Sequence, residues 1–259
     1  MNDRGKMMTF GGHLDALRGM LFRILGVTAA IGVLIFTFKE ETFNLLLAPA
    51  NSRFTTWQLL QRLGDALGME THIGDFHVQL ISTELASQFT THVTTSALLA
   101  MLVASPYIVF ELFCFVSPAL YARERRYFIR LCIGVYVLFL LGVVLSYYVV
   151  FPVSFRFLGT YQVAERVVNQ INISSYISSF VQLTFLMGLL FQLPVVIFFL
   201  TKTGVVSADF LRRMRRQVIL LICIVAAIIT PPDAFSLLLV ATPVWLLYEA
   251  SVWIAARWV

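Results

Sequence analysis

Long apolar runs alternate with short polar segments along this chain. Four runs are long enough to cross a bilayer, at residues 21–38, 89–113, 128–151 and 176–201. A membrane-spanning helix needs ~20 apolar residues, and continuous runs rather than alternating residues exclude a transmembrane β-barrel. The pattern therefore predicts an all-α, polytopic helical membrane protein.

Two shorter apolar runs follow, at residues 218–229 and 234–248, separated by the turn Thr230-Pro231-Pro232-Asp233. As helices they reach only ~18–23 Å, against a hydrocarbon core of ~30 Å. They fit either a re-entrant hairpin or two true spans in a locally thinned bilayer. Residues 251–259 extend the last helix and add Trp253 and Arg257, residue types that anchor helices at the interface. We predict six transmembrane helices, the last two short, in a single domain of residues 1–259.

The longest polar stretch, residues 39–88, is the predicted main outer loop. Within it, apolar residues recur at helical spacing, as in a short amphipathic helix on the membrane surface: Trp57, Leu60, Leu63 and Leu67. Farther on, apolar and polar residues alternate over 76–80, which predicts a brief extended segment.

Composition agrees with the membrane interpretation. Of the 259 residues, 59% are hydrophobic and 13% charged, whereas a soluble domain has about half and about a quarter. These values exclude a disordered chain. The net charge of +5 suits a membrane protein that gathers Lys and Arg on its cytoplasmic loops.

The distribution of basic residues predicts the orientation. With the amino terminus inside and six spans, fourteen of the 19 Lys and Arg residues fall on inner segments. The outer segments hold the remaining five: Lys39, Arg53, Arg62, Arg156 and Arg166. This bias places both termini in the cytoplasm, whether the last pair spans the membrane or is re-entrant.

No motif for catalysis or metal binding is present. The sequence contains no HExxH, GxSxG, P-loop or Cys/His zinc pattern. His72 and His77 lie five residues apart in a glycine-bearing loop, which indicates two solvated histidines more than a metal site. We therefore predict no catalytic residues, no metal and no cofactor, and a protein that is not an enzyme.

Several motifs occur in an order that resembles one family. They are His13-Leu14-x-x-Leu17-Arg18; Pro49; Phe115-x-x-Pro118-x-Leu120-Tyr121-x-x-Glu124-Arg125; Tyr176, Gly188, Phe191 and Pro194; Thr230-Pro231-Pro232-Asp233; and Pro243, Tyr248 and Glu249. Together they resemble the TatC family, the multispanning core and receptor subunit of the twin-arginine protein translocase. The resemblance runs from about His13 to Trp253.

The resemblance implies a function and partners. TatC-like proteins bind signal peptides that carry two adjacent arginines at the cytoplasmic face of the inner membrane. With single-span TatA- and TatB-type proteins they export folded cargo, driven by the proton-motive force. The resemblance thus implies a multi-pass inner-membrane protein in a homo- or hetero-oligomer, without nucleic acid.

The signal-peptide site is implied by two of these motifs, with Asp15 and Glu124 as its carboxylates. A receptor for paired guanidinium groups needs carboxylates, because arginine donates a planar fork to them. Glu124 also has an alternative as a local ion-pair partner of neighbouring arginines. Asp15 stands one position before Ala16, where the family has glutamate, and has an alternative as a partner for Arg18. The other residues that the resemblance places at the site are Arg18, Phe115, Pro118 and Tyr121.

Further polar residues match the family in the last three apolar runs. Gln192 stands where the family often has glutamate. Three roles are open for it: a contact with a partner helix, a packing contact within the chain, or a hydrogen bond to backbone freed by Pro194. Glu249 is predicted to pair with Arg257 or with a residue on another helix. The predicted structural turns are formed by Pro49, Pro231, Pro232 and Asp233.

A rival class is a secondary transporter or channel. Such a protein predicts an inverted repeat, broken helices and a charged pair at midplane depth. The sequence shows no convincing repeat, and its first four runs have no acidic residue at midplane depth. A purely structural membrane scaffold is a third class, and the motifs favour TatC over both.

Overall fold

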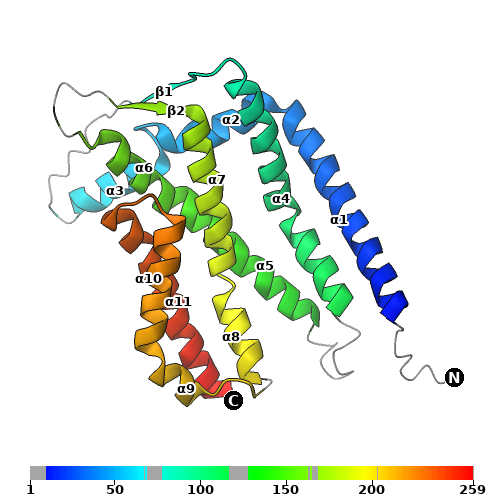
Figure 1. Cartoon of the computed structure of the whole chain (residues 1–259). Coiled ribbons are helices and arrows are strands. Elements are labelled where there is room, and N and C mark those ends of the chain that lie inside the picture. The colour runs from blue at the N-terminus through cyan, green and yellow to red at the C-terminus, as the bar shows by residue number, and fades with distance from the viewer. Residues whose placement is uncertain are drawn as a thin grey trace. The chain divides into compact units, whose positions relative to one another are not determined.

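The structure is a computed structural model, which describes residues 10–66, 68, 78–116, 128–162, 164, 169–202 and 204–258. Most of the described residues are helical, as the sequence predicts (Figure 1). They group into two compact units, residues 1–39 with 92–136 and residues 40–91 with 137–259.

The first unit is built on two antiparallel helices, α1 (Phe10–Thr37) and α4 (Ser87–Val116), of which the part from His92 belongs here. At one end the rings of His13 and Phe115 lie 4.6 Å apart, and at the other Phe36 stacks on His92 at 4.1 Å. Both helices outrun the predicted apolar runs. The residues from Phe10 to Met20, which precede the predicted run, form the first turns of α1. Pro106 lies inside α4 without ending it.

The second unit contains the remaining elements. Its bounds are α2 (Lys39–Leu47), η1 (Ala48–Ala50), α3 (Thr55–Ala66), β1 (Gln79–Ile81), α5 (Phe128–Leu145, shared with the first unit), η4 (Ser146–Val150), α6 (Phe151–Thr160), β2 (Gln170–Asn172), α7 (Ile173–Leu190), α8 (Leu193–Lys202), α9 (Ala208–Arg213), α10 (Arg215–Ile229) and α11 (Ala234–Trp258). The strands β1 and β2 are parallel, with Leu80 opposite Ile171.

The third predicted span, residues 128–151, continues as helix past its predicted end and through Pro152. A π-helical turn, η4, follows α5, and α6 then continues the helix to Thr160. Proline lacks an N–H and its ring clashes with the carbonyl four residues back, but π-turns shift the bonding by one residue and proline is tolerated in a first helical turn. Residues 153–160 are therefore helix rather than loop.

The fourth span is broken by Pro194. The helix α7 ends at Leu190 and α8 begins at Leu193, with Phe191 and Gln192 in a turn between them. Because Pro194 cannot donate to the carbonyl of Leu190, the α-helical ladder is interrupted there. The backbone N–H of Gln192 instead donates to the carbonyl of Leu189 at 2.9 Å.

The last two helices differ in length. The helix α10 has 15 residues, or ~22 Å, and is short as predicted. The helix α11 has 25 residues, because the helix continues well past the apolar run, through Ser251 and Arg257. Of the last two helices, therefore, only α10 is short.

Segments of the predicted outer loop pack on the second unit's aromatic core. The hydroxyl of Tyr147 donates to the carbonyl of Leu45, and that of Tyr176 to the carbonyl of Leu46, both at 2.8 Å. The amphipathic helix predicted there is α3, with Trp57 buried. Arg156 of α6 lies 4.7 Å from the Trp57 ring.

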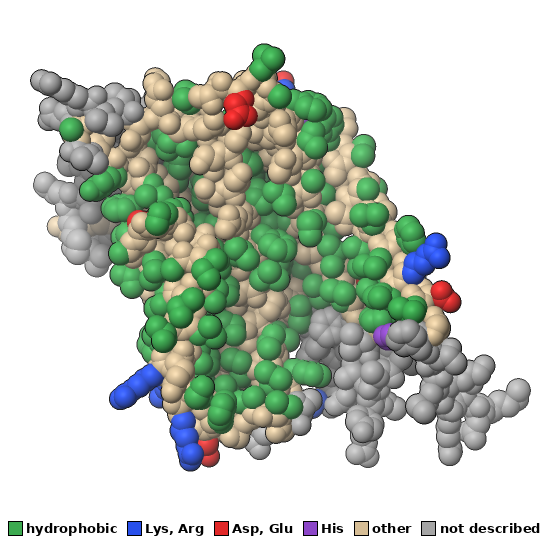
Figure 2. Space-filling model, viewed as in Figure 1, with side chains coloured by type: hydrophobic (Ala, Val, Ile, Leu, Met, Phe, Trp, Pro, Cys, Tyr) green, Lys and Arg blue, Asp and Glu red, His purple; other side chains and the backbone are tan. Residues whose placement is uncertain are grey.

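Five helical segments among the described residues are long and apolar enough to cross a membrane: 11–37, 87–112, 133–160, 173–202 and 234–257. At most a third of each apolar window is buried. Figure 2 shows hydrophobic side chains over most of the visible face, with few charged ones among them. A surface this apolar suits lipid rather than water. The short helix α10 is not among the five, so the six-span count stays a prediction.

Candidate functional site: polar groups of two units

The first motif of the predicted signal-peptide site lies on the exposed first turns of α1. Both Asp15 and Arg18 are exposed there. Neither forms an ion pair with any described residue, so the alternative role of Asp15 as a partner for Arg18 is not seen. Arg18 instead lies over the Phe22 ring at 5.6 Å.

The second motif is described only at its start. Phe115 lies one residue before the end of α4, half-buried, against His13 of α1. Glu124, Pro118 and Tyr121 lie outside the described residues. The contact of His13 with Phe115 nevertheless brings the two motifs together within the first unit, because each residue belongs to a different motif.

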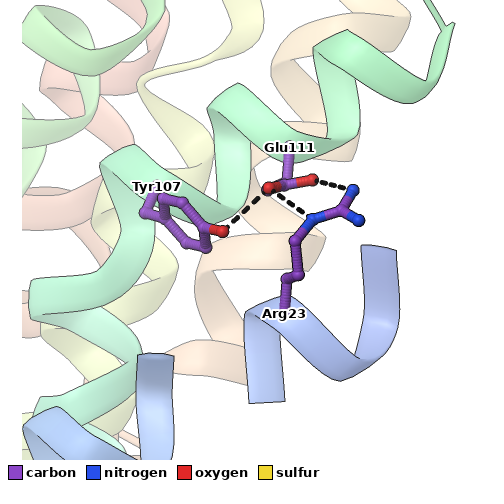
Figure 3. Close-up of polar contacts among 3 residues, drawn as sticks. All are labelled: Arg23, Tyr107 and Glu111. Atoms are coloured by element: carbon purple, nitrogen blue, oxygen red, sulfur yellow. Dashed lines mark hydrogen bonds and ion pairs between the residues drawn. The ribbon is translucent and has the colours of Figure 1, made fainter. Parts of the chain in front are cut away.

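A buried glutamate, which sequence reasoning did not single out, joins α1 to α4. Glu111 accepts two hydrogen bonds from the guanidinium of Arg23, from Nε at 2.9 Å and from Nη2 at 2.8 Å (Figure 3). The hydroxyl of Tyr107, one turn earlier on α4, donates to the same carboxylate at 2.8 Å. The Glu111 side chain is 9% exposed and that of Arg23 58%.

Glu111 interrupts the apolar run of the second span, one helical turn after Tyr107. An acid in such a run needs a partner inside the protein, because an unpaired carboxylate in hydrocarbon is costly. That interruption was the signal available in the sequence. Two parallel N–H···O bonds between an arginine fork and a carboxylate form the strong bidentate geometry, so the pair fixes α1 against α4.

Gln192 lies in the break between α7 and α8 and is half-buried. Its amide Nε2 donates to the carbonyl of Gly188 at 3.4 Å. That carbonyl would accept from the backbone of residue 192 in an unbroken helix, but the backbone N–H there turns to Leu189. Of the alternatives drawn from the sequence, the structure shows the bond to backbone freed at the proline break.

Glu249 pairs with another helix. Its Oε2 accepts from Nη2 of Arg215 at the start of α10, at 2.8 Å. Arg257 lies over the Trp253 ring at 4.0 Å instead. Beside this pair, the hydroxyl of Tyr248 donates to the carbonyl of Leu211 at 2.7 Å. These contacts join α9 and the start of α10 to the middle of α11.

The prolines predicted to form structural turns lie between helices or in a short 3₁₀ helix. Pro49 is buried in the 3₁₀ helix η1. Pro231 and Pro232 separate α10 from α11, and the Asp233 carboxylate accepts from the backbone N–H of Ser236 at 2.6 Å. This bond satisfies a free N–H in the first turn of α11. Asp233 therefore starts the helix as well as closing the turn.

In the described part of the chain, no group of three or more His, Cys, Asp or Glu side chains could hold a metal ion. Cys114 and Cys223 are both free thiols. The polar groups described above instead have two roles: some pair one helix with another, and others form turns at helix ends. They define a class, a polytopic α-helical membrane protein whose helices are joined by a few polar contacts.

Comparisons with known proteins identify the family. The sequence profile described as "Sec-independent protein translocase protein (TatC)" matches residues 12–243. The TatC proteins of a Blattabacterium of Periplaneta americana and of Escherichia coli K12 are each 30% identical to this chain. The matches cover 98% of the chain and 97% of the Blattabacterium protein, and 95% of the chain and 88% of the E. coli protein.

Solved structures agree. A crystal structure of the "Twin Arginine Translocase Receptor- TatC" superposes with a TM-score of 0.72 at 28% identity, over 95% of this chain and 100% of that one. A second, in DDM, gives a TM-score of 0.75 at 27% identity, over 94% of this chain and 99% of that one. The chain belongs to the TatC family. It is a multi-pass membrane subunit of the twin-arginine protein translocase, a translocase family and not an enzyme family.

Proposed function

We propose that this chain binds twin-arginine signal peptides at its cytoplasmic face, through carboxylates near the start of α1 and after the end of α4. The contact of His13 with Phe115 carries the proposal, because it joins the two motifs within one compact unit. The motifs come from segments about a hundred residues apart in sequence, and their meeting at one end of α1 and α4 suits a single binding surface.

The chemistry follows from the charges. Asp15 is exposed and forms no ion pair with a described residue, so its carboxylate is available to a guanidinium group. Glu124 supplies the second carboxylate. The family motif assigns Phe115, Pro118 and Tyr121 to the same site. Arginine suits such a site better than lysine, because its planar fork gives two bonds to one carboxylate.

Binding of a synthetic signal peptide to the purified protein tests this proposal. The Glu124→Gln variant should bind the Arg-Arg peptide less tightly by ~1.5–3 kcal/mol, the value of a hydrogen bond to a charged group. Asp15→Asn should have a smaller effect. Asp209→Asn, which removes an exposed carboxylate of α9, is the matched control and should leave the affinity unchanged.

A Lys-Lys version of the peptide should bind the wild-type protein more weakly than the Arg-Arg version. If Glu124→Gln and wild type bind the Arg-Arg peptide equally, Glu124 is not part of the site. If Asp209→Asn weakens binding as much as Glu124→Gln does, the effect is one of net charge and the proposed site is wrong.

We further propose that TatA- and TatB-type single-span proteins dock beside Gln192, and that with them the chain exports folded cargo using the proton-motive force. A half-buried amide in a broken membrane helix supports this, since its hydrogen-bonding groups have little water to meet. Gln192→Leu should reduce cross-linking to the partner helix and leave peptide affinity unchanged. If the Gln192→Leu variant transports cargo fully, Gln192 does not bind a partner and only makes contacts within its own chain.

The inner membrane, with both termini in the cytoplasm, is the proposed location and orientation. The excess of Lys and Arg on the segments assigned to the inside supports it. Three of those arginines, Arg213, Arg215 and Arg216, lie at the junction of α9 and α10.

A further inference from the structure

An open apolar groove runs along the first unit, between α1 and α4. Its volume is about 1080 Å³, at the upper end of the ~300–1,000 Å³ typical of ligand sites. Among its lining residues only Arg18, Thr28 and Ser96 are polar, and Arg18 is the only charged one. The groove is therefore an apolar channel with a single positive charge.

The charge of Arg18 is not neutralised within the described part of the chain. No described carboxylate lies within ion-pair distance of its guanidinium. Arg23, about one and a half turns farther along α1, is by contrast held by Glu111 with two hydrogen bonds. Since Arg18 is exposed at the mouth of an apolar groove, its natural complement is an anion attached to an apolar body.

The length of the groove's inner half matches one leaflet of a bilayer. From Arg18 to Ala29 the groove follows eleven residues of α1, or ~16 Å. Half of a ~30 Å hydrocarbon core is ~15 Å. Beyond Ala29 the lining continues through Gly32, Val33 and Phe36, so the whole groove follows α1 for 22 residues from Leu14, or ~33 Å. The half of the groove that begins at Arg18 therefore has the length of an acyl chain in the inner leaflet.

We propose that the inner half of this groove binds an anionic phospholipid, with the phosphate on Arg18 and one acyl chain along Leu21, Leu25 and Met101. An anionic headgroup near an arginine at the membrane surface gains ~1 kcal/mol per basic residue, which is about fivefold in binding. The proposal uses the orientation given above, with the amino terminus inside, but does not depend on signal-peptide binding.

Charge favours a lipid over a signal peptide as the occupant. The groove lining contains no carboxylate that could hold the cations of a twin-arginine peptide, and Asp15, which is proposed to bind them, is not among the lining residues. A partner helix with an apolar surface would gain nothing from Arg18. An amphiphile with a phosphate uses both the apolar lining and the single charge.

Native mass spectrometry of the purified full chain tests the proposal. Phosphatidylglycerol, which is anionic, should be retained about fivefold over phosphatidylethanolamine, which is zwitterionic. The Arg18→Gln variant should lose this preference, and Arg18→Lys should keep most of it. The matched control is Arg213→Gln, which removes an exposed arginine at the end of α9 and should keep the full preference.

The position of the lipid is tested with phosphatidylglycerol that carries a photoreactive group at the end of an acyl chain. Cross-links should fall near Ala29 and Met101 and should decrease in Arg18→Gln. Equal lipid preference in wild type and Arg18→Gln would overturn the proposal, and so would cross-links scattered evenly over the helices. Displacement of the lipid by a twin-arginine peptide, or co-purification of a partner helix in its place, would assign the groove to that occupant instead.

Discussion

In the first unit, the charges of Arg23 and Glu111 neutralise each other in one ion pair. The carboxylate has three hydrogen bonds, two from Arg23 and one from Tyr107, so its oxygens are well satisfied despite their burial (Figure 3). Breaking a buried pair by removing one partner is more costly than the pair's net contribution, because the other charge is left uncompensated. The pair therefore acts as a specific lock between α1 and α4.

Glu111→Gln should destabilise the protein. The glutamine keeps the size of the side chain but removes the charge that holds the Arg23 fork, so the thermal unfolding midpoint in detergent should fall by roughly 2–4 °C. Arg212→Gln is the control, because its contact with Asp209 is 3.4 Å long and exposed at both ends. An unchanged midpoint in Glu111→Gln would show that the pair contributes nothing to stability.

The sequence predicted some single residues well and others poorly, for physical reasons. The turn at Asp233 follows from local chemistry and could be predicted from a few neighbouring residues. The break at Pro194 was not predicted, because residues 176–201 were expected to form one span. The partners of Arg23 and Glu249 could not be predicted, because each pairs with a residue on a different helix, at sequence separations of 88 and 34. Glu124, at the centre of the proposed site, lies outside the described residues and stays a prediction.

At the scale of elements, α5 and α7 cross closely through two glycines. A methyl group on Gly142 would lie 2.6 Å from the backbone carbonyl oxygen of Met187 and 2.9 Å from the Cα of Gly188. A methyl group on Gly188 would lie 2.6 Å from the ring of Phe139. Small residues at helix crossings let backbones approach, and dispersion contacts drive helix association in lipid. The crossing thus depends on the absence of side chains at these two positions.

Gly142→Ala should force α5 and α7 apart. Because the neighbouring atoms are backbone and cannot rotate away, we expect a loss of about 1–3 kcal/mol in the free energy of unfolding, the usual cost of overpacking. The control is Gly134→Ala on the same helix, where an added methyl group meets nothing within 4 Å. Thermal unfolding of both variants in detergent measures the difference. If the two behave alike, the crossing is looser than the structure shows.

Apolar runs predicted which segments are helices but not where the helices end. Hydropathy changes at the membrane surface, whereas a helix ends where its backbone bonding ends. The helix α1 therefore begins at Phe10 rather than Leu21, and α11 continues to Trp258. The same difference explains why Pro152 did not end the third span, since the π-turn before it accommodates the proline.

At the scale of the whole molecule, the topology depends on the hairpin of α10 and α11. One end carries the Pro231-Pro232 turn, and the other carries the ion pair of Arg215 with Glu249. These ends are separated by the length of α10, ~22 Å. Arginines gather at the ion-pair end, next to α9. The charge bias therefore predicts that this end lies inside and that the proline turn lies at the opposite surface.

Single-cysteine labelling tests this topology. In a variant whose three native cysteines are replaced by alanine, Ala234→Cys should react with a membrane-impermeant maleimide in intact cells, because Ala234 is exposed directly after the proline turn. Val205→Cys, 70% exposed between α8 and α9, is the inside control and should react only after the membrane is opened.

A helix of ~22 Å can still cross a core of ~30 Å if the bilayer thins around it, at a modest cost per ångström. Labelling of Ala234→Cys only from the cytoplasmic side would exclude that crossing, make the last pair re-entrant, and reduce the six predicted spans to four.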